Sequence, residues 1–166
     1  MFEVLVYVYE SYWRGDACPE LPQLGRKLSI AGFEPDEISQ ALFWLEGLNR
    51  AAVDTQMGAA PAAPGASAGM TESRQSPISM RVYSVAEQDH LGAQCLGFVS
   101  FLETSGVLPA PMREIVLDRA MAVPGDPVLL DDLKIIVLMV YWHFGEEPDS
   151  LVLDELCDDT SERLAH

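Results

Sequence analysis

Nucleophilic catalysis would require a serine or cysteine beside a histidine that an acidic side chain orients, so the positions of the histidines decide whether such a site exists. They are His90, His143 and His166, and no G-x-S-x-G motif accompanies them. His90 and Cys95 lie five residues apart on one predicted helix, which turns them toward different sectors of its surface. Cys95 also falls within an apolar stripe, where an inert core thiol is expected. We therefore predict no catalytic residues of this kind.

Metal and nucleotide sites require equally specific spacings. The three cysteines, Cys18, Cys95 and Cys157, form no C-x-x-C pair, which argues against a zinc site or a disulfide framework. Asp131 and Asp132 resemble a magnesium-binding pair, but they open a predicted helix, where acidic residues stabilise the helix dipole. No glycine-rich phosphate loop is present. We expect no cofactor and no metal.

Arg119 is the remaining residue that could do chemistry, because it falls within the apolar sector of a helix predicted over residues 111–123. A buried guanidinium needs a carboxylate partner, since an unpaired buried charge is costly. Asp131, Asp132 or an acid near the C-terminal end could serve. The structural interpretation is an ion pair at the rim of the core. The alternatives are an anchor for a partner's carboxylate, or an enzyme that uses Arg119 with Asp131 or Asp132.

The charge of the chain is strongly negative. Ten basic and 26 acidic residues give a net charge of −16, and residues 145–166 carry eight acids against Arg163 alone. Such a field repels phosphate backbones and favours basic partners. We expect a basic protein partner, with proteins that handle nucleic acid as one class. The alternative is that the acidic end serves only solubility.

Apolar residues at helical spacing predict three helices in the N-terminal segment, over about residues 2–13, 20–30 and from 35 onward. Residues 57–70 read MGAAPAAPGASAGM, a low-complexity sequence typical of a flexible linker. We therefore predict a tri-helical lobe at 1–53 and a linker at 54–75. Direct DNA reading by the third helix is an alternative function, but this helix carries Asp36, Glu37 and Glu46 against Arg50, which disfavours it.

The second lobe is predicted at 76–145, with helices over about 85–105, 111–123 and 131–144 and at most a short strand near Arg81. Ser84 and Glu87 form a capping box at the first of these helices. Gly97 lies inside this helix, and we expect another helix to approach it closely. An acidic, partly helical tail at 146–166 completes a mainly α fold of two small lobes.

The longest apolar run, residues 135–144, contains ten residues, whereas a helix that crosses a bilayer needs about 20. We read it as a buried helix and expect no membrane association. The cysteine content fits a reducing cytoplasm.

Aromatic residues are the best candidates for a partner-binding patch, because they are enriched at interface hot spots. The candidates are Phe43, Trp44 and Trp13, with Arg119 as a possible anchor. Phe43 projects away from the apolar face of the third helix, so it either packs against the second lobe or is exposed.

Five segments of the chain resemble the bacterial Smg family, in the order in which that family has them. They read MFEVLVYVYESY, AGFEPDEISQALFWLEGL, SMRVYSVAEQDHLGAQCLGFVSFLETSGVL, REIVLDRAMA and LDDLKIIVLMVYW. The resemblance implies an uncharacterised family without an assigned enzyme activity, which supplies no catalytic residues to carry over. The leading hypothesis is therefore a non-enzymatic, acidic protein-interaction module.

Overall fold

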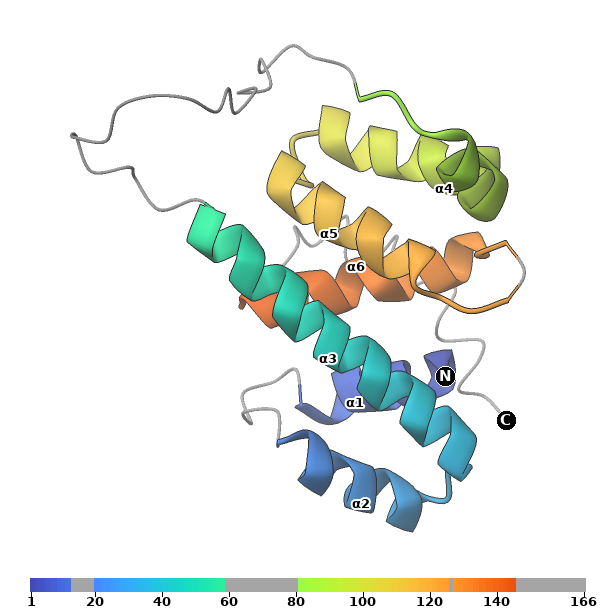
Figure 1. Cartoon of the computed structure of the whole chain (residues 1–166), viewed down its shortest axis with the longest axis vertical. Coiled ribbons are helices and arrows are strands. Elements are labelled where there is room, and N and C mark those ends of the chain that lie inside the picture. The colour runs from blue at the N-terminus through green and yellow to red at the C-terminus, as the bar shows by residue number, and fades with distance from the viewer. Residues whose placement is uncertain (13–19, 59–80, 126, 146–166) are drawn as a thin grey trace, which may run out of the picture.

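The computed structural model describes residues 1–12, 20–58, 81–125 and 127–145, and six α-helices account for most of them (Figure 1). No strand occurs within these ranges, and residues 81–84 form an irregular segment in place of the short strand considered above. The prediction of a mainly α fold is confirmed. The helices are α1 (Phe2–Tyr12), α2 (Leu21–Ala31), α3 (Pro35–Gly58), α4 (Val85–Thr104), α5 (Ala110–Met121) and α6 (Leu130–Phe144).

Helix α6 is the centre of the fold, because it is mainly apolar and is buried on all sides. Nine consecutive residues, from Leu133 to Tyr141, are buried. The helix contacts α1, α3, α4 and α5. Asp131 and Asp132 lie in its first turn, where they stabilise the dipole, and Gly145 ends it with a positive φ of 66°. No helix in the described ranges is long and apolar enough to cross a membrane.

Helix α3 joins the two ends of the molecule. It runs diagonally from α1 and α2, at the lower end in Figure 1, to α5 and α6 above them. Buried residues of all six helices form one hydrophobic cluster. The two predicted lobes thus share a core. Helix α3 also continues to Gly58, into the segment predicted as a linker. The rest of that linker and the acidic tail lie outside the described residues.

Helix α4 begins with the predicted capping box. The Ser84 side chain accepts from the backbone N–H of Glu87, and the Glu87 carboxylate accepts from the backbone N–H of Ser84 at 2.7 Å. These two contacts satisfy N–H groups that a helix start leaves without intrahelical acceptors.

A break at Gly92 divides α4. Gly92 has φ 68° and ψ 171°, a conformation that is essentially restricted to glycine. The loop before α6 is tied to this break, because the backbone N–H of Val128 donates to the His90 carbonyl at 2.8 Å. The Cys95 thiol in turn donates to the Val128 carbonyl at 3.3 Å. The expected close approach of another helix at Gly97 is wrong for the described residues: apart from the neighbouring backbone of α4 itself, none comes within 4 Å of the position a Cβ would take.

The two glycines of α4 predict opposite effects of the same substitution. Gly92→Ala should destabilise the protein by about 1–3 kcal/mol, because alanine does not tolerate the backbone conformation. Gly97→Ala should stabilise it by about 0.5–1 kcal/mol, because the site is helical and open. Urea unfolding of both variants measures this. Destabilisation of equal size in both would contradict the described break.

Candidate functional site on helix α3

Helix α3 has an inward face that builds the core and an outward face that bears a large aromatic side chain. The buried residues of the inward face are Ile38, Ala41, Trp44, Leu45, Leu48 and Ala52. They recur every three or four residues, as one side of a helix requires. Phe43 cannot share that side and is 77% exposed. Of the two positions considered for Phe43, the structure has the exposed one.

Trp44 is a core residue at the edge of the inward face, about 100° around the helix from Phe43. Its side chain is 2% exposed, and its indole N–H donates to the Arg119 carbonyl at 2.9 Å. This contact fixes α3 against α5. Trp44 therefore positions the helix on which Phe43 is displayed. Trp13, the other tryptophan predicted for a partner patch, lies outside the described residues.

Two acidic side chains and one basic side chain share the outer face of α3 with Phe43. Asp36 lies two turns before it and is exposed. Glu46 lies one turn after it, is exposed, and pairs with Arg50 at 3.3 Å. Exposed pairs of this kind are weak, so this carboxylate remains available to another cation. The outer face thus combines a large apolar side chain with nearby negative charge.

Arg119 lies behind this face, between α5 and α3. Its guanidinium pairs with the carboxylate of Asp118 at 2.6 Å, and its side chain is only 14% exposed. It occupies the space above Gly47, where a Cβ would come within 1.7 Å of Nη1. In the described part of the chain its ion pair is with Asp118, not with Asp131 or Asp132, which instead begin α6.

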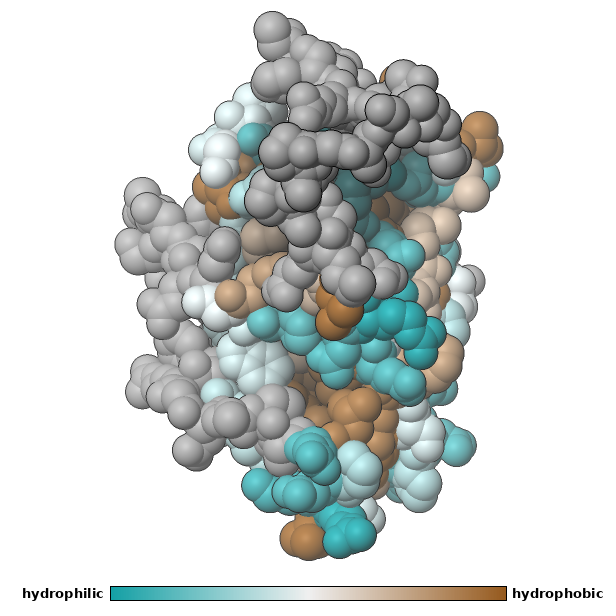
Figure 2. Space-filling model, turned by 60° about the vertical axis from the view of Figure 1, so that its left-hand side comes forward, coloured by the Kyte–Doolittle hydropathy of each residue, from teal (hydrophilic) through white to brown (hydrophobic). Residues whose placement is uncertain are grey.

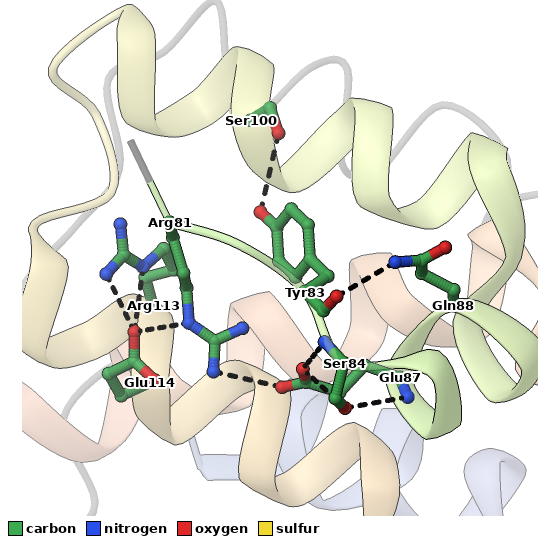
Figure 3. A network of polar contacts seen from close by, with 8 residues as sticks. All are labelled: Arg81, Tyr83, Ser84, Glu87, Gln88, Ser100, Arg113 and Glu114. Carbon is green, nitrogen blue, oxygen red and sulfur yellow. Dashed lines mark hydrogen bonds and ion pairs between the residues drawn. The ribbon is translucent and has the colours of Figure 1, made fainter. Parts of the chain in front are cut away.

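A polar network that the sequence did not reveal joins the start of α4 to α5 (Figure 3). Arg113 is almost fully buried and pairs with Glu103 and, at 2.7 Å, with Glu114. Arg81 donates to the same Glu114 oxygen at 2.9 Å and to Glu87 at 2.9 Å. Arg113 and Glu114 are neighbours in the sequence, but this does not predict the network, because their other partners come from distant positions in the chain.

The network shifts the pKa values of Arg81 and Glu87. Burial alone would lower the pKa of Arg81, but hydrogen bonds to Glu87 and Glu114 raise it overall. The backbone N–H of Ser84 lowers the pKa of Glu87; burial opposes this, and the contact with Arg81 adds to the lowering. Both residues are therefore charged at neutral pH, and the network acts as a set of structural ion pairs.

The groups considered for catalysis stand apart from this network. Burial raises the pKa of the Cys95 thiol, and the nearby Asp132 carboxylate raises it further. Burial lowers the pKa of His143, whose ring packs edge-on against Phe144. Among the described residues, no three His, Cys, Asp or Glu side chains gather as metal ligands.

Comparison with known proteins places the chain in a family. The family model described as "Protein of unknown function (DUF494)" matches residues 1–166. "Protein Smg homolog" of Leptothrix cholodnii is 57% identical over the whole of both chains. The chain belongs to the Smg family. The Smg homologs of Methylibium petroleiphilum and Bordetella avium are 55% and 46% identical, again over both full lengths. No solved structure matches the chain.

Replacing each of the two adjacent aromatic residues of α3 should have very different effects on the stability of the protein. Phe43→Ala should change the free energy of unfolding by no more than about 0.5 kcal/mol, because the side chain is exposed. Trp44→Phe should cost about 1–3 kcal/mol, because it leaves the Arg119 carbonyl without its donor. Denaturant unfolding compares the two. A large loss in Phe43→Ala would show that this side chain is packed and would remove it as a surface candidate.

The Glu87 contacts predict a pH-dependent contribution to stability. Because the folded-state pKa is lowered, the carboxylate stabilises the protein above its ordinary pKa of 4.5, and this contribution declines as the pH falls below that value. Glu87→Gln should therefore cost about 1 kcal/mol at pH 7 and less at about pH 3. Glu46→Gln, in an exposed pair, is the control and should cost less than about 0.5 kcal/mol. A cost for Glu87→Gln that is independent of pH would contradict the assignment.

Proposed function

We propose that this Smg-family chain is a non-enzymatic interaction module that binds a basic protein on the outer face of α3. The observation that carries the proposal is the 77% exposure of Phe43 on a helix whose other face is anchored in the core. Aromatic side chains are enriched at the centres of interfaces, and this one is exposed on a helix that the core holds in place. A rigid helix presents such a side chain without a cost for ordering the backbone on binding.

The charge of the chain supports a basic partner. A net charge of −16 attracts cationic surfaces over distances of about one Debye length and accelerates their encounter. Asp36 and Glu46 give this attraction a local counterpart beside Phe43. The partner surface that fits is therefore a pocket for one aromatic side chain, bordered by lysine or arginine. Proteins that handle nucleic acid offer such surfaces, and the cysteine content favours a cytoplasmic setting.

The proposal assigns different roles to hydrophobic contact and charge. Phe43 would supply most of the affinity, because burial of one aromatic side chain at an interface is worth about 2 kcal/mol or more. The carboxylates would supply orientation and association rate, because exposed charges contribute little affinity and are screened by salt.

Affinity capture with matched phenylalanine variants tests the proposal. The full chain, Phe43→Ala and Phe101→Ala are immobilised and exposed to cytosol of the source cells, and retained proteins are quantified. Phe101 is 59% exposed on α4, so it controls for the loss of an exposed phenylalanine elsewhere. A basic protein should be retained by the full chain and by Phe101→Ala, and at least about tenfold less by Phe43→Ala.

A wash at high salt distinguishes the contribution of the Phe43 contact from that of the carboxylates. Washing at about 1 M salt, where the Debye length is only about 3 Å, should reduce but not abolish retention by the full chain, because screening removes the contribution of the carboxylates and leaves the Phe43 contact. Retention of every captured protein by Phe43→Ala at wild-type levels would overturn the proposed face. A set of captured proteins without any basic member would overturn the proposed partner class.

A further inference from the structure

A second surface feature lies between α1 and α2 and is independent of the α3 face. It is an open hollow of about 320 Å³, within the range of small binding sites. In Figure 2, the lower part of the molecule, where α1 and α2 lie, shows an apolar surface bordered by polar side chains. The residues that line the hollow are Tyr7, Ser11, Tyr12, Lys27, Ile30 and Ala31.

The polar lining is held in place by local contacts. The Lys27 ammonium donates to the Tyr12 hydroxyl at 3.1 Å and also lies 5.1 Å from the centre of the same ring. Tyr7 packs edge-on against Phe33, with 5.3 Å between the ring centres. An ammonium has three N–H donors, so contact with one hydroxyl leaves capacity for a further acceptor. The hollow thus presents a cation beside hydroxyl groups.

The local charge of α2 is opposite to that of the chain. Residues 21–31 contain Arg26 and Lys27 and no acidic residue, whereas the whole chain carries −16. Within the lining, Lys27 is the one charged side chain. A single cation beside tyrosine hydroxyls complements a single carboxylate. It does not suit a polyphosphate, which the field of the whole chain would repel.

An apolar wall lies on the same face of α2 as Lys27, one turn further along the helix. Ile30 is 86% exposed although it is a large aliphatic residue, and Ala31 continues this wall. Exposed aliphatic surface next to an oriented cation fits a ligand with an apolar group adjacent to its charge. On a polypeptide, this combination is an aspartate or glutamate next to a leucine, isoleucine or similar residue.

We infer that the hollow between α1 and α2 binds a partner polypeptide at a carboxylate side chain adjacent to an apolar one. Lys27 pairs with the carboxylate, the hydroxyls of Tyr12 and Ser11 complete its hydrogen bonds, and Ile30 covers the apolar side chain. This inference does not rest on the α3 face, because it uses other helices and a ligand of opposite charge.

Backbone amide NMR of the full chain tests the inference with two blocked dipeptides. The probe is N-acetyl-Leu-Glu-amide, and its neutral match is N-acetyl-Leu-Gln-amide. The glutamate peptide should cause saturable shifts in residues 7–12 and 27–31, with about three- to fivefold higher affinity than the glutamine peptide. Lys27→Met, which keeps the aliphatic stem, should abolish that preference, whereas Arg26→Met should retain it.

Several outcomes would overturn the inference. They are the absence of shifts, shifts confined to other residues, equal affinity for both peptides, or a preference that survives in Lys27→Met with its thermal unfolding unchanged. A short oligothymidylate that shifts residues 7–12 and 27–31, while the glutamate peptide does not, would reassign the hollow to phosphate binding. Repeating the titration with Phe43→Ala keeps the two surfaces distinct, since that variant should bind the peptide normally.

Discussion

Burial of α6 is the constraint on which the rest of the structure depends. A helix that is mainly apolar and buried on every side requires other helices to cover it in all directions, and α1, α3, α4 and α5 do so. The cover must come from both ends of the sequence, because each end contributes helices with one apolar face. The arrangement also explains why α3 is long: it reaches from the α1–α2 end to α5 and α6, and its outward side is therefore displayed across the molecule.

Charge is organised around this apolar centre in two ways. Inside, Arg113 and Arg81 are neutralised by Glu103, Glu114 and Glu87, which lets polar residues close the side of the bundle where α4 meets α5. Outside, carboxylates dominate, except along α2. The net charge of the chain is −16, but α2 contains no acidic residue. The surface is therefore mainly negative, with a locally positive part along α2. This contrast is the physical basis for assigning different partners to the outer face of α3 and to the hollow between α1 and α2.

Periodicity and capping residues were sufficient to locate all six helices to within a few residues, because these signals are local. They also placed Phe43 on the outer side of α3. Partners that are distant in sequence could not be predicted. Arg119 was expected to be the buried arginine in need of an acid, whereas Arg113 is the more deeply buried, since Glu103 of α4 lies beside it. Likewise, Gly92 and not Gly97 has the backbone conformation that requires glycine. The neighbouring contact between the Val128 amide and the His90 carbonyl joins positions far apart in the chain, so no local signal predicts it.

Because α3 spans the molecule, binding at one surface would affect the stability of the other helices. Because all six helices share one cluster, local opening of α3 exposes core residues of both ends, and the cost of opening is therefore common to them. A ligand that binds only the closed form of α3 raises that cost everywhere the cluster extends. Amide protons of α4 and α6 would then exchange more slowly with solvent, although no ligand atom touches them. In this fold, a ligand bound at one surface would therefore increase hydrogen-exchange protection across the whole bundle.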